Sequence, residues 1–405
     1  MRRTAQILLL IFVFSIPWEY SLDLGAPLGN VARIAGLLLF AISALALVQA
    51  RRLRTPGAMQ WLTLALYLWF CCTFFWTAAP DVTLIKLRGY FQEMMIVWIA
   101  WEFVDSPQDL RTLLRAWLAG SWVLAILTIA SFASHDPASG EQIRFAAFGQ
   151  DPNDVARYLD LGFPIAALLL DGKERRMVTL LAVGYLPLGF ACVLLTASRG
   201  GFLAAIVAFA GCTMLLVRRS PGRTLGGAMA LPVAAAFVWF LAPQGTLERI
   251  GSIAEQLRSG DLNQRVNIWS AGWSAFVKAP FCGHGAGSFV TAAGLAPIDT
   301  AHNTVLSILV EGGLCALVLA GCLVVLSLRG ILATHGALRV ALMASIAVWL
   351  TSSLVGTVGE SRTTWLLLAV AALGGRFADE EPDELEKVFP SASLARDLRW
   401  AERAE

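Results

Sequence analysis

The chain has 405 residues, of which 57% are hydrophobic and 15% are charged, and its formal net charge at pH 7 is +2. This composition lies outside the range of a soluble domain of such length. We therefore expect the protein to be surrounded by membrane lipids and to bind no nucleic acid.

Long apolar runs recur along the chain, each near the roughly 20 residues that cross a bilayer as a helix. They predict an all-α integral membrane protein with about twelve transmembrane helices. The first run resembles a signal peptide, but no small-residue cleavage site precedes Glu19, so we interpret it as a retained helix. The predicted spans are 5–18, 31–50, 59–77, 89–104, 112–133, 154–170, 177–196, 201–217, 225–243, 303–328, 337–357 and 363–377.

Lysine and arginine are unequally divided between the two faces that these spans define. Of the 31, 20 fall on the face that holds both termini, and the positive-inside rule places that face in the cytoplasm. We expect a polytopic domain over residues 1–377 and a charged cytoplasmic tail over residues 378–405. The outer face keeps Arg33, Lys86, Arg88, Arg144, Arg157, Arg199, Arg249, Arg258, Arg265, Lys278 and Arg362.

Four of these outer cations, Lys86, Arg88, Arg199 and Arg362, lie in short connections. An arginine at a helix end can simply reach phospholipid phosphates. For Arg199 we favour a function, because the glycines that follow it let the backbone approach a ligand closely. For Arg362 we favour a structural ion pair with the neighbouring Glu360.

The longest polar interruption covers residues 244–302 and is expected on the outer face. Apolar residues at helical spacing over about 265–278 predict an amphipathic helix along the membrane, or a lid on the helical bundle. Arg265 opens this helix, where the helix dipole disfavours a cation, so we infer that it meets an anion. In the glycine-rich turn that follows, His284 is interpreted as a turn residue.

His302 stands where this loop passes into an apolar helix, with Asp299 and Thr300 as candidate caps. A helix start lowers the pKa of histidine and keeps the ring able to accept a proton near pH 7. Glu311 lies about 13 Å further along the helix axis, too far to touch His302. We expect Glu311 to pair with an arginine inside the bundle, with Arg199 as the candidate.

Metal or cofactor chemistry has no signal in the sequence. Six of the seven cysteines fall in predicted helices, and only Cys282 lies in the outer loop. Neither a Cys/His spacing typical of zinc nor an acidic cage is present in the sequence. We expect no metal and no cofactor.

In their order and spacing, these residues resemble the O-antigen ligase and polymerase superfamily of bacterial inner-membrane glycosyltransferases. The resemblance is carried by Ser198-Arg199-Gly200, Arg265, Gly283-His284-Gly285 and His302-Asn303…Glu311-Gly312, and it concentrates in residues 145–315. It implies a GT-C type helical fold with a large periplasmic loop. It also implies a periplasmic active site and a glycan donor linked to undecaprenyl diphosphate.

The resemblance also implies roles for particular residues. Arg199 and Arg265 would hold the diphosphate, and His302 would be the catalytic base. Lys86 and Arg88 are further candidates for the diphosphate, while Glu311, Asn303 and Arg362 are candidates for supporting roles. In a ligase, glycan passes to a sugar hydroxyl of the lipid A–core acceptor without a metal. Back-side attack by that hydroxyl predicts inversion at the anomeric carbon.

Three alternatives remain open. An O-antigen or exopolysaccharide polymerase would use a second lipid-linked glycan as acceptor. A protein O-oligosaccharyltransferase tends to carry a longer C-terminal region than the short tail here. A lipid-linked glycan transporter would show inverted repeats and ionisable groups near mid-membrane, whereas the charges here gather at the outer face.

Overall fold

The computed structural model describes residues 1–22, 24–25, 29–135, 144–171, 174–217, 232, 236, 239–240, 244–252, 265–297 and 299–390. Within these ranges the regular elements are helices, and no strand is present. The helices are α1 (Arg2–Ser15), η1 (Ile16–Trp18), α2 (Val31–Ala50), α3 (Ala58–Thr73), α4 (Pro80–Phe103), α5 (Pro107–Ala133), α6 (Pro152–Asp171), α7 (Arg176–Leu195), α8 (Arg199–Val217), α10 (Gln244–Gly251), α12 (Arg265–Lys278), α13 (Phe289–Ala293), α14 (Thr304–Ala333), α15 (Gly336–Val355), α16 (Arg362–Glu380) and α17 (Pro382–Val388).

The helices confirm an all-α membrane protein. In the described part of the chain, α2, α5, α7, α8, α14 and α15 are long and apolar enough to cross a membrane. Each predicted span overlaps a helix, except the ninth, 225–243, which lies largely outside the described residues. The number of spans therefore stays a prediction. The predicted tail boundary falls inside α16, and residues 391–405 of the tail lie outside the described part.

Local sequence signals explain where the helices begin. The hydroxyl of Ser106 accepts a hydrogen bond from the Asp109 amide, and the Asp109 carboxylate accepts one in return, which caps α5. Pro80 and Asp81 begin α4 well before the predicted start of that span. Lys86 and Arg88 consequently lie inside α4, not in a connection before it.

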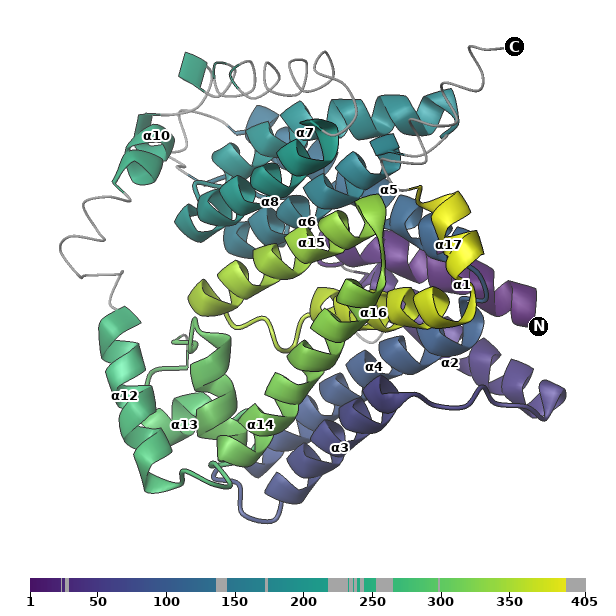
Figure 1. Cartoon of the computed structure of the whole chain (residues 1–405). Helices are drawn as coiled ribbons and strands as arrows, with labels where there is room; N and C mark the ends of the chain where they lie inside the picture. Colours follow the sequence, from purple (N-terminus) through teal and green to yellow (C-terminus); the bar gives the residue numbers. More distant parts are fainter. Residues whose placement is uncertain are drawn as a thin grey trace, which may run out of the picture.

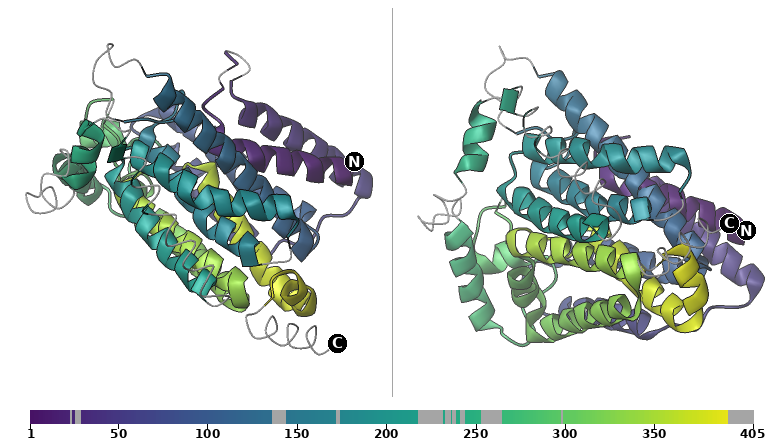
Figure 2. Two further views of the ribbon diagram at one scale, coloured as in Figure 1. Left: turned by 90° about the horizontal axis from the view of Figure 1, so that it is seen from above. Right: turned by 45° about the horizontal axis from the view of Figure 1, so that its top comes forward.

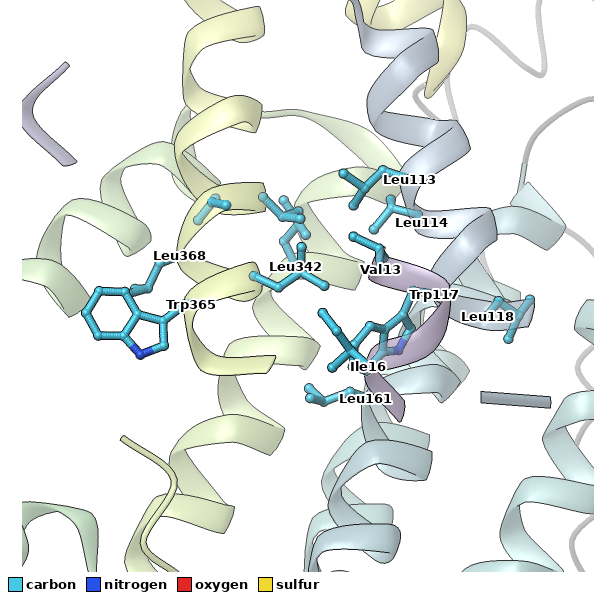
Figure 3. Packing of buried hydrophobic residues seen from close by; sticks show 14 of the residues in the cluster. Val13, Ile16, Leu113, Leu114, Trp117, Leu118, Leu161, Leu342, Trp365 and Leu368 are labelled. Atoms are coloured by element: carbon cyan, nitrogen blue, oxygen red, sulfur yellow. The ribbon is translucent and has the colours of Figure 1, made fainter. Parts of the chain in front are cut away.

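The core is built by helices that are distant in sequence. Figure 3 shows Val13 of α1, Trp117 of α5, Leu161 of α6, Leu342 of α15 and Trp365 of α16 packing around one region. In contrast, many large apolar side chains point outward, among them Leu37, Leu38, Met177, Ile206, Val318 and Val325. A soluble monomer rarely exposes so much apolar surface, whereas lipid would cover it.

The two ends of α4 mark two ends of the molecule. At one end, Glu102 and Asp105 bind Arg2, and Asp105 also binds Arg54 at 2.8 Å. Lys86 lies sixteen residues before Glu102 on α4, which is about 24 Å along the helix axis. Figures 1 and 2 place α12 and α13 on the side of the molecule opposite the N-terminus and α17. The loop predicted on the outer face, which contains α12 and α13, therefore lies at the end of the molecule remote from the N-terminus.

Helix α14 is broken near its N-terminal end. Gly313 has φ 66° and ψ −165°, which interrupts the helical hydrogen bonds. The glycine-rich turn docks into this break: the amide of Leu314 donates to Pro280 O at 2.8 Å, and the amide of Gly285 donates to Glu311 O at 2.9 Å. Backbone groups freed inside a membrane must find such partners. The turn thus completes α14 and fixes the direction of Glu311.

Candidate functional site

A polar cavity of about 830 Å³ lies at the end of the molecule that holds α12 and α13. Its walls come from α4, the starts of α6 and α8, α12, α13, the start of α14 and the connection from α15 to α16. The ionisable residues that line it are Lys86, Asp151, Asp154, Arg157, Arg265, His302, Glu311 and Glu360.

The structure brings four predicted site residues, Lys86, Arg265, His302 and Glu311, to this cavity. Arg199 adjoins it, because its neighbours Ser198 and Gly200 are part of the wall. The remaining candidates, Arg88, Asn303 and Arg362, are not among the residues that line it. Segments more than 200 residues apart in the sequence thus converge on one site.

His302 is held by neighbours on both sides. The indole of Trp269 in α12 donates to the carbonyl of Ala301 at 3.0 Å, and the hydroxyl of Thr304 donates to the carbonyl of Gly356 at 2.8 Å. His302 itself has φ 45°, a left-handed conformation that is uncommon for residues other than glycine. The ring is therefore presented by a fixed backbone, with the Thr300 hydroxyl 3.3 Å from Nε2.

The helix cap differs from the prediction. Asn303, rather than Asp299 or Thr300, caps α14, because its side-chain oxygen accepts a hydrogen bond from the Leu306 amide at 3.0 Å. His302 lies just before the cap. The pKa of His302 is lowered below its usual 6.5, first by burial and then by the charge of Arg265, while Asp151 and Asp299 oppose the shift. The ring is therefore neutral near pH 7.

Four arginines, which we call the arginine cluster, lie near one another, and Arg265 among them also lies near His302: Arg144, Arg199, Arg249 and Arg265. Burial and the charges of Arg249, Arg265 and Arg199 lower the pKa of Arg144, against the effect of Asp151. Burial and Arg249 likewise lower the pKa of Arg265. The positive charges of these arginines repel one another, so a bound anion would stabilise the cluster.

Arg199 does not pair with Glu311 as predicted. Its guanidinium donates to the carbonyl of Arg249 at 2.9 Å and to the hydroxyl of Ser252 at 2.6 Å. The glycines after it are required for helix packing: a Cβ on Gly200 would lie 2.7 Å from Val355, and one on Gly201 would lie 2.3 Å from Ala156. This packing brings the start of α8 against α6 and α15 at the cavity wall.

Glu311 has partners of a different kind. Its carboxylate accepts hydrogen bonds from the amide of Gly287 at 2.8 Å and from the hydroxyl of Ser307 at 3.3 Å. Within the described residues it forms no ion pair closer than 4.0 Å. It is 4% exposed and still lines the cavity.

The predicted partner of Arg362 is also wrong. Arg362 forms an ion pair with Glu19, in the segment after α1, and both side chains are largely shielded from solvent. Glu360 instead pairs with Lys86 of α4 at the cavity wall. A structural role for Arg362 is consistent with this contact, but the carboxylate that it needs lies far away in the sequence.

Three residues were not predicted from the sequence to belong to the site: Arg157, Glu360 and Arg249. Arg157 lies on α6, is 7% exposed, and bonds Asp154 at 3.0 Å. Its Nε has no hydrogen-bond partner among the described residues. A charged residue inside an apolar span was a usable signal, because such residues are costly in a membrane unless they serve a purpose.

Comparison with known proteins gives one match. The model of the family described as O-antigen ligase matches residues 184–321, from α7 to the middle of α14. The matched part includes Arg199, Arg265, His302 and Glu311, whereas Arg157 and Glu360 lie outside it. The comparisons with curated proteins and with solved structures gave no match. Over residues 184–321 the chain is therefore similar to the O-antigen ligase family, which confirms the resemblance identified in its sequence.

Proposed function

We propose that the protein is an O-antigen ligase, a glycosyltransferase that moves a glycan from undecaprenyl diphosphate to a sugar hydroxyl of lipid A–core. The proposal depends on one observation above all: His302 and Arg265 line the same cavity, with Arg199 beside it. A proton acceptor and an anion site side by side are what this transfer needs.

In the proposed reaction, the acceptor hydroxyl oxygen attacks the anomeric carbon of the glycan. The bond between that carbon and the diphosphate oxygen breaks, and polyprenyl diphosphate leaves. The hydroxyl proton passes to the neutral imidazole of His302, a transfer typically worth about 10²–10⁴-fold in rate. Attack from the side opposite the leaving group inverts the anomeric configuration.

The diphosphate is assigned to arginines. Arg265, which lines the cavity, and Arg199, which adjoins it, bind it. Planar guanidinium groups suit diphosphate because they can donate two parallel hydrogen bonds, and they stabilise the charge that develops as the bond breaks. Lys86 is neutralised by Glu360, and Arg88 does not line the cavity, so we no longer assign the diphosphate to either.

The setting of the reaction belongs to the same proposal. We propose about twelve spans in a GT-C type arrangement, in the bacterial inner membrane, with both termini cytoplasmic and the cavity periplasmic. The grouping of Arg2, Arg54, Glu102 and Asp105 at the end remote from Lys86 supports this orientation. The exposed Val266, Trp273 and Val277 of α12 suit contact with the membrane surface.

The decisive test is transfer by the purified protein in proteoliposomes. Undecaprenyl-diphosphate-linked glycan and rough lipopolysaccharide are supplied, with a chelator and without an energy source, and the product is followed on gels. A ligase extends the lipopolysaccharide. Extension of the lipid-linked glycan alone would identify a polymerase, and absence of any transfer would overturn the assignment to an enzyme of this class.

A further inference from the structure

One end of the cavity differs from the arginine cluster in its charge. Lys86, Glu311 and Glu360 all line it there, and the ammonium group of Lys86 pairs with Glu360. Both Lys86 and Glu311 lie against Gly287: its amide binds Glu311 at 2.8 Å, and a Cβ there would lie 2.6 Å from Cγ of Lys86. This end is therefore a single structural unit that contains two carboxyl groups.

The two carboxylates, which we call the carboxylate pair (Glu311 and Glu360), are placed by different parts of the fold. Glu311 is directed by the break in α14, where the Gly285 amide binds its carbonyl at 2.9 Å. Glu360 comes from the connection between α15 and α16 and is held by Lys86. Glu311 accepts one hydrogen bond from the Gly287 amide and one from the Ser307 hydroxyl, so its carboxylate can accept further hydrogen bonds from a ligand with donors.

Arg157 provides a second observation at this end. Its Nη2 lies 3.5 Å from the hydroxyl of Ser361, the residue next to Glu360. The side chain is 7% exposed and lines the cavity, yet its Nε has no acceptor among the described residues. A polar ligand with both donors and acceptors, such as a sugar, would satisfy this guanidinium and the carboxylate pair together.

We propose that the carboxylate pair and Lys86 form the subsite for the acceptor, where the carboxylates accept hydrogen bonds from hydroxyl groups of the acceptor glycan. This inference rests on the proposed function. A carboxylate has no hydrogen to donate to a diphosphate oxygen, whereas it accepts strong hydrogen bonds from neutral hydroxyls. Glu311 lies nine residues beyond His302, about 13 Å along α14, so it binds a sugar other than the one that carries the attacking hydroxyl.

The test is a kinetic comparison in the reconstituted transfer assay with rough lipopolysaccharide as acceptor. Glu360→Gln and Glu311→Gln keep the shape and remove the charge, and Glu384→Gln, on α17 outside the cavity, is the matched control. We expect each cavity variant to raise the KM for the acceptor about tenfold, since a hydrogen bond to a charged group is weakened. The KM for the lipid-linked donor stays unchanged, and so do both constants in Glu384→Gln.

Two results for these variants would overturn the inference. One is an unchanged KM for the acceptor, and the other is a rise in the KM for the donor instead of the acceptor. Glu311 is buried, so if Glu311→Gln fails to fold, Glu360→Gln decides alone, because its side chain is 30% exposed. The control for the proposed function is separate. If the wild-type protein transfers glycan and Arg265→Lys impairs it while the glutamine variants behave as wild type, only the acceptor subsite is wrong.

Discussion

Arg265 lies close enough to His302 to disfavour a positive charge on the imidazole ring, and burial acts in the same direction. Arg265 comes from α12 and His302 from the segment before α14, and Trp269 links the two by its hydrogen bond to Ala301. The anion site and the base are thus coupled through one short piece of structure. A diphosphate bound to Arg265 would also act on the ring, because it compensates the guanidinium charge.

This coupling predicts a pH profile. Transfer should rise with pH until His302 is deprotonated, and the half-maximal point of kcat/KM should lie below the usual pKa of about 6.5. In Arg265→Gln the cation that lowers the pKa is gone, so this point should move to higher pH whatever the residual rate. Arg249→Gln is the matched control, and an equal shift there would remove the specific link between Arg265 and His302.

Replacing His302 by asparagine separates chemistry from folding. Asparagine tolerates the left-handed backbone at this position, so His302→Asn should purify and elute as the wild type does. It cannot act as a base, and we expect a loss of about 10²–10⁴-fold in kcat. Normal transfer by this variant, measured by lipopolysaccharide extension, would rule out His302 as the base.

Arg265→Lys keeps the charge and removes the planar fork. If Arg265 holds the diphosphate with two parallel hydrogen bonds, most activity should be lost, with the larger effect on use of the lipid-linked donor. Lys278→Arg, at the other end of α12, is the control: it makes the opposite exchange between lysine and arginine outside the cavity, and activity should be unchanged. Equal activity with lysine at position 265 would favour a diffuse electrostatic effect.

Two glycines of α14 provide a matched pair for the break in this helix. At Gly313 a Cβ would lie 2.2 Å from the carbonyl oxygen of Phe281, and its φ and ψ are accessible essentially to glycine alone. Gly313→Ala should therefore cost at least about 1–3 kcal/mol and release the turn that directs Glu311. Gly321 has open space around its Cα, so Gly321→Ala should be neutral or stabilise by up to about 1 kcal/mol.

The measurement is the midpoint of thermal unfolding in detergent, together with transfer activity. A lower midpoint for Gly313→Ala, with an unchanged or higher one for Gly321→Ala, is the expected pattern. If both variants unfold like the wild-type protein, the docked turn is not needed to complete α14.

Features that depend on nearby residues could be predicted from the sequence. The helices follow from apolar runs and local caps, α12 covers the predicted 265–278, and His302 stands at a loop-to-helix junction. Topology placed Lys86, Arg265 and His302 on a shared face, so their convergence could be anticipated only to that extent. Glu311 was expected inside the bundle. The start of α4 was misplaced because hydropathy outweighed the proline and aspartate that begin it.

The sequence by itself determined an apolar helical protein, the positions of its charged residues along the helices, and the similarity of its central part to the O-antigen ligase family. Only the tertiary structure decided which charges meet: Glu311 with the Gly287 amide, Lys86 with Glu360, and Arg362 with Glu19. The reason is physical. Helix formation and capping are local, whereas an ion pair inside a helical bundle depends on which distant helix faces the charge, and neither spacing nor hydropathy encodes that choice.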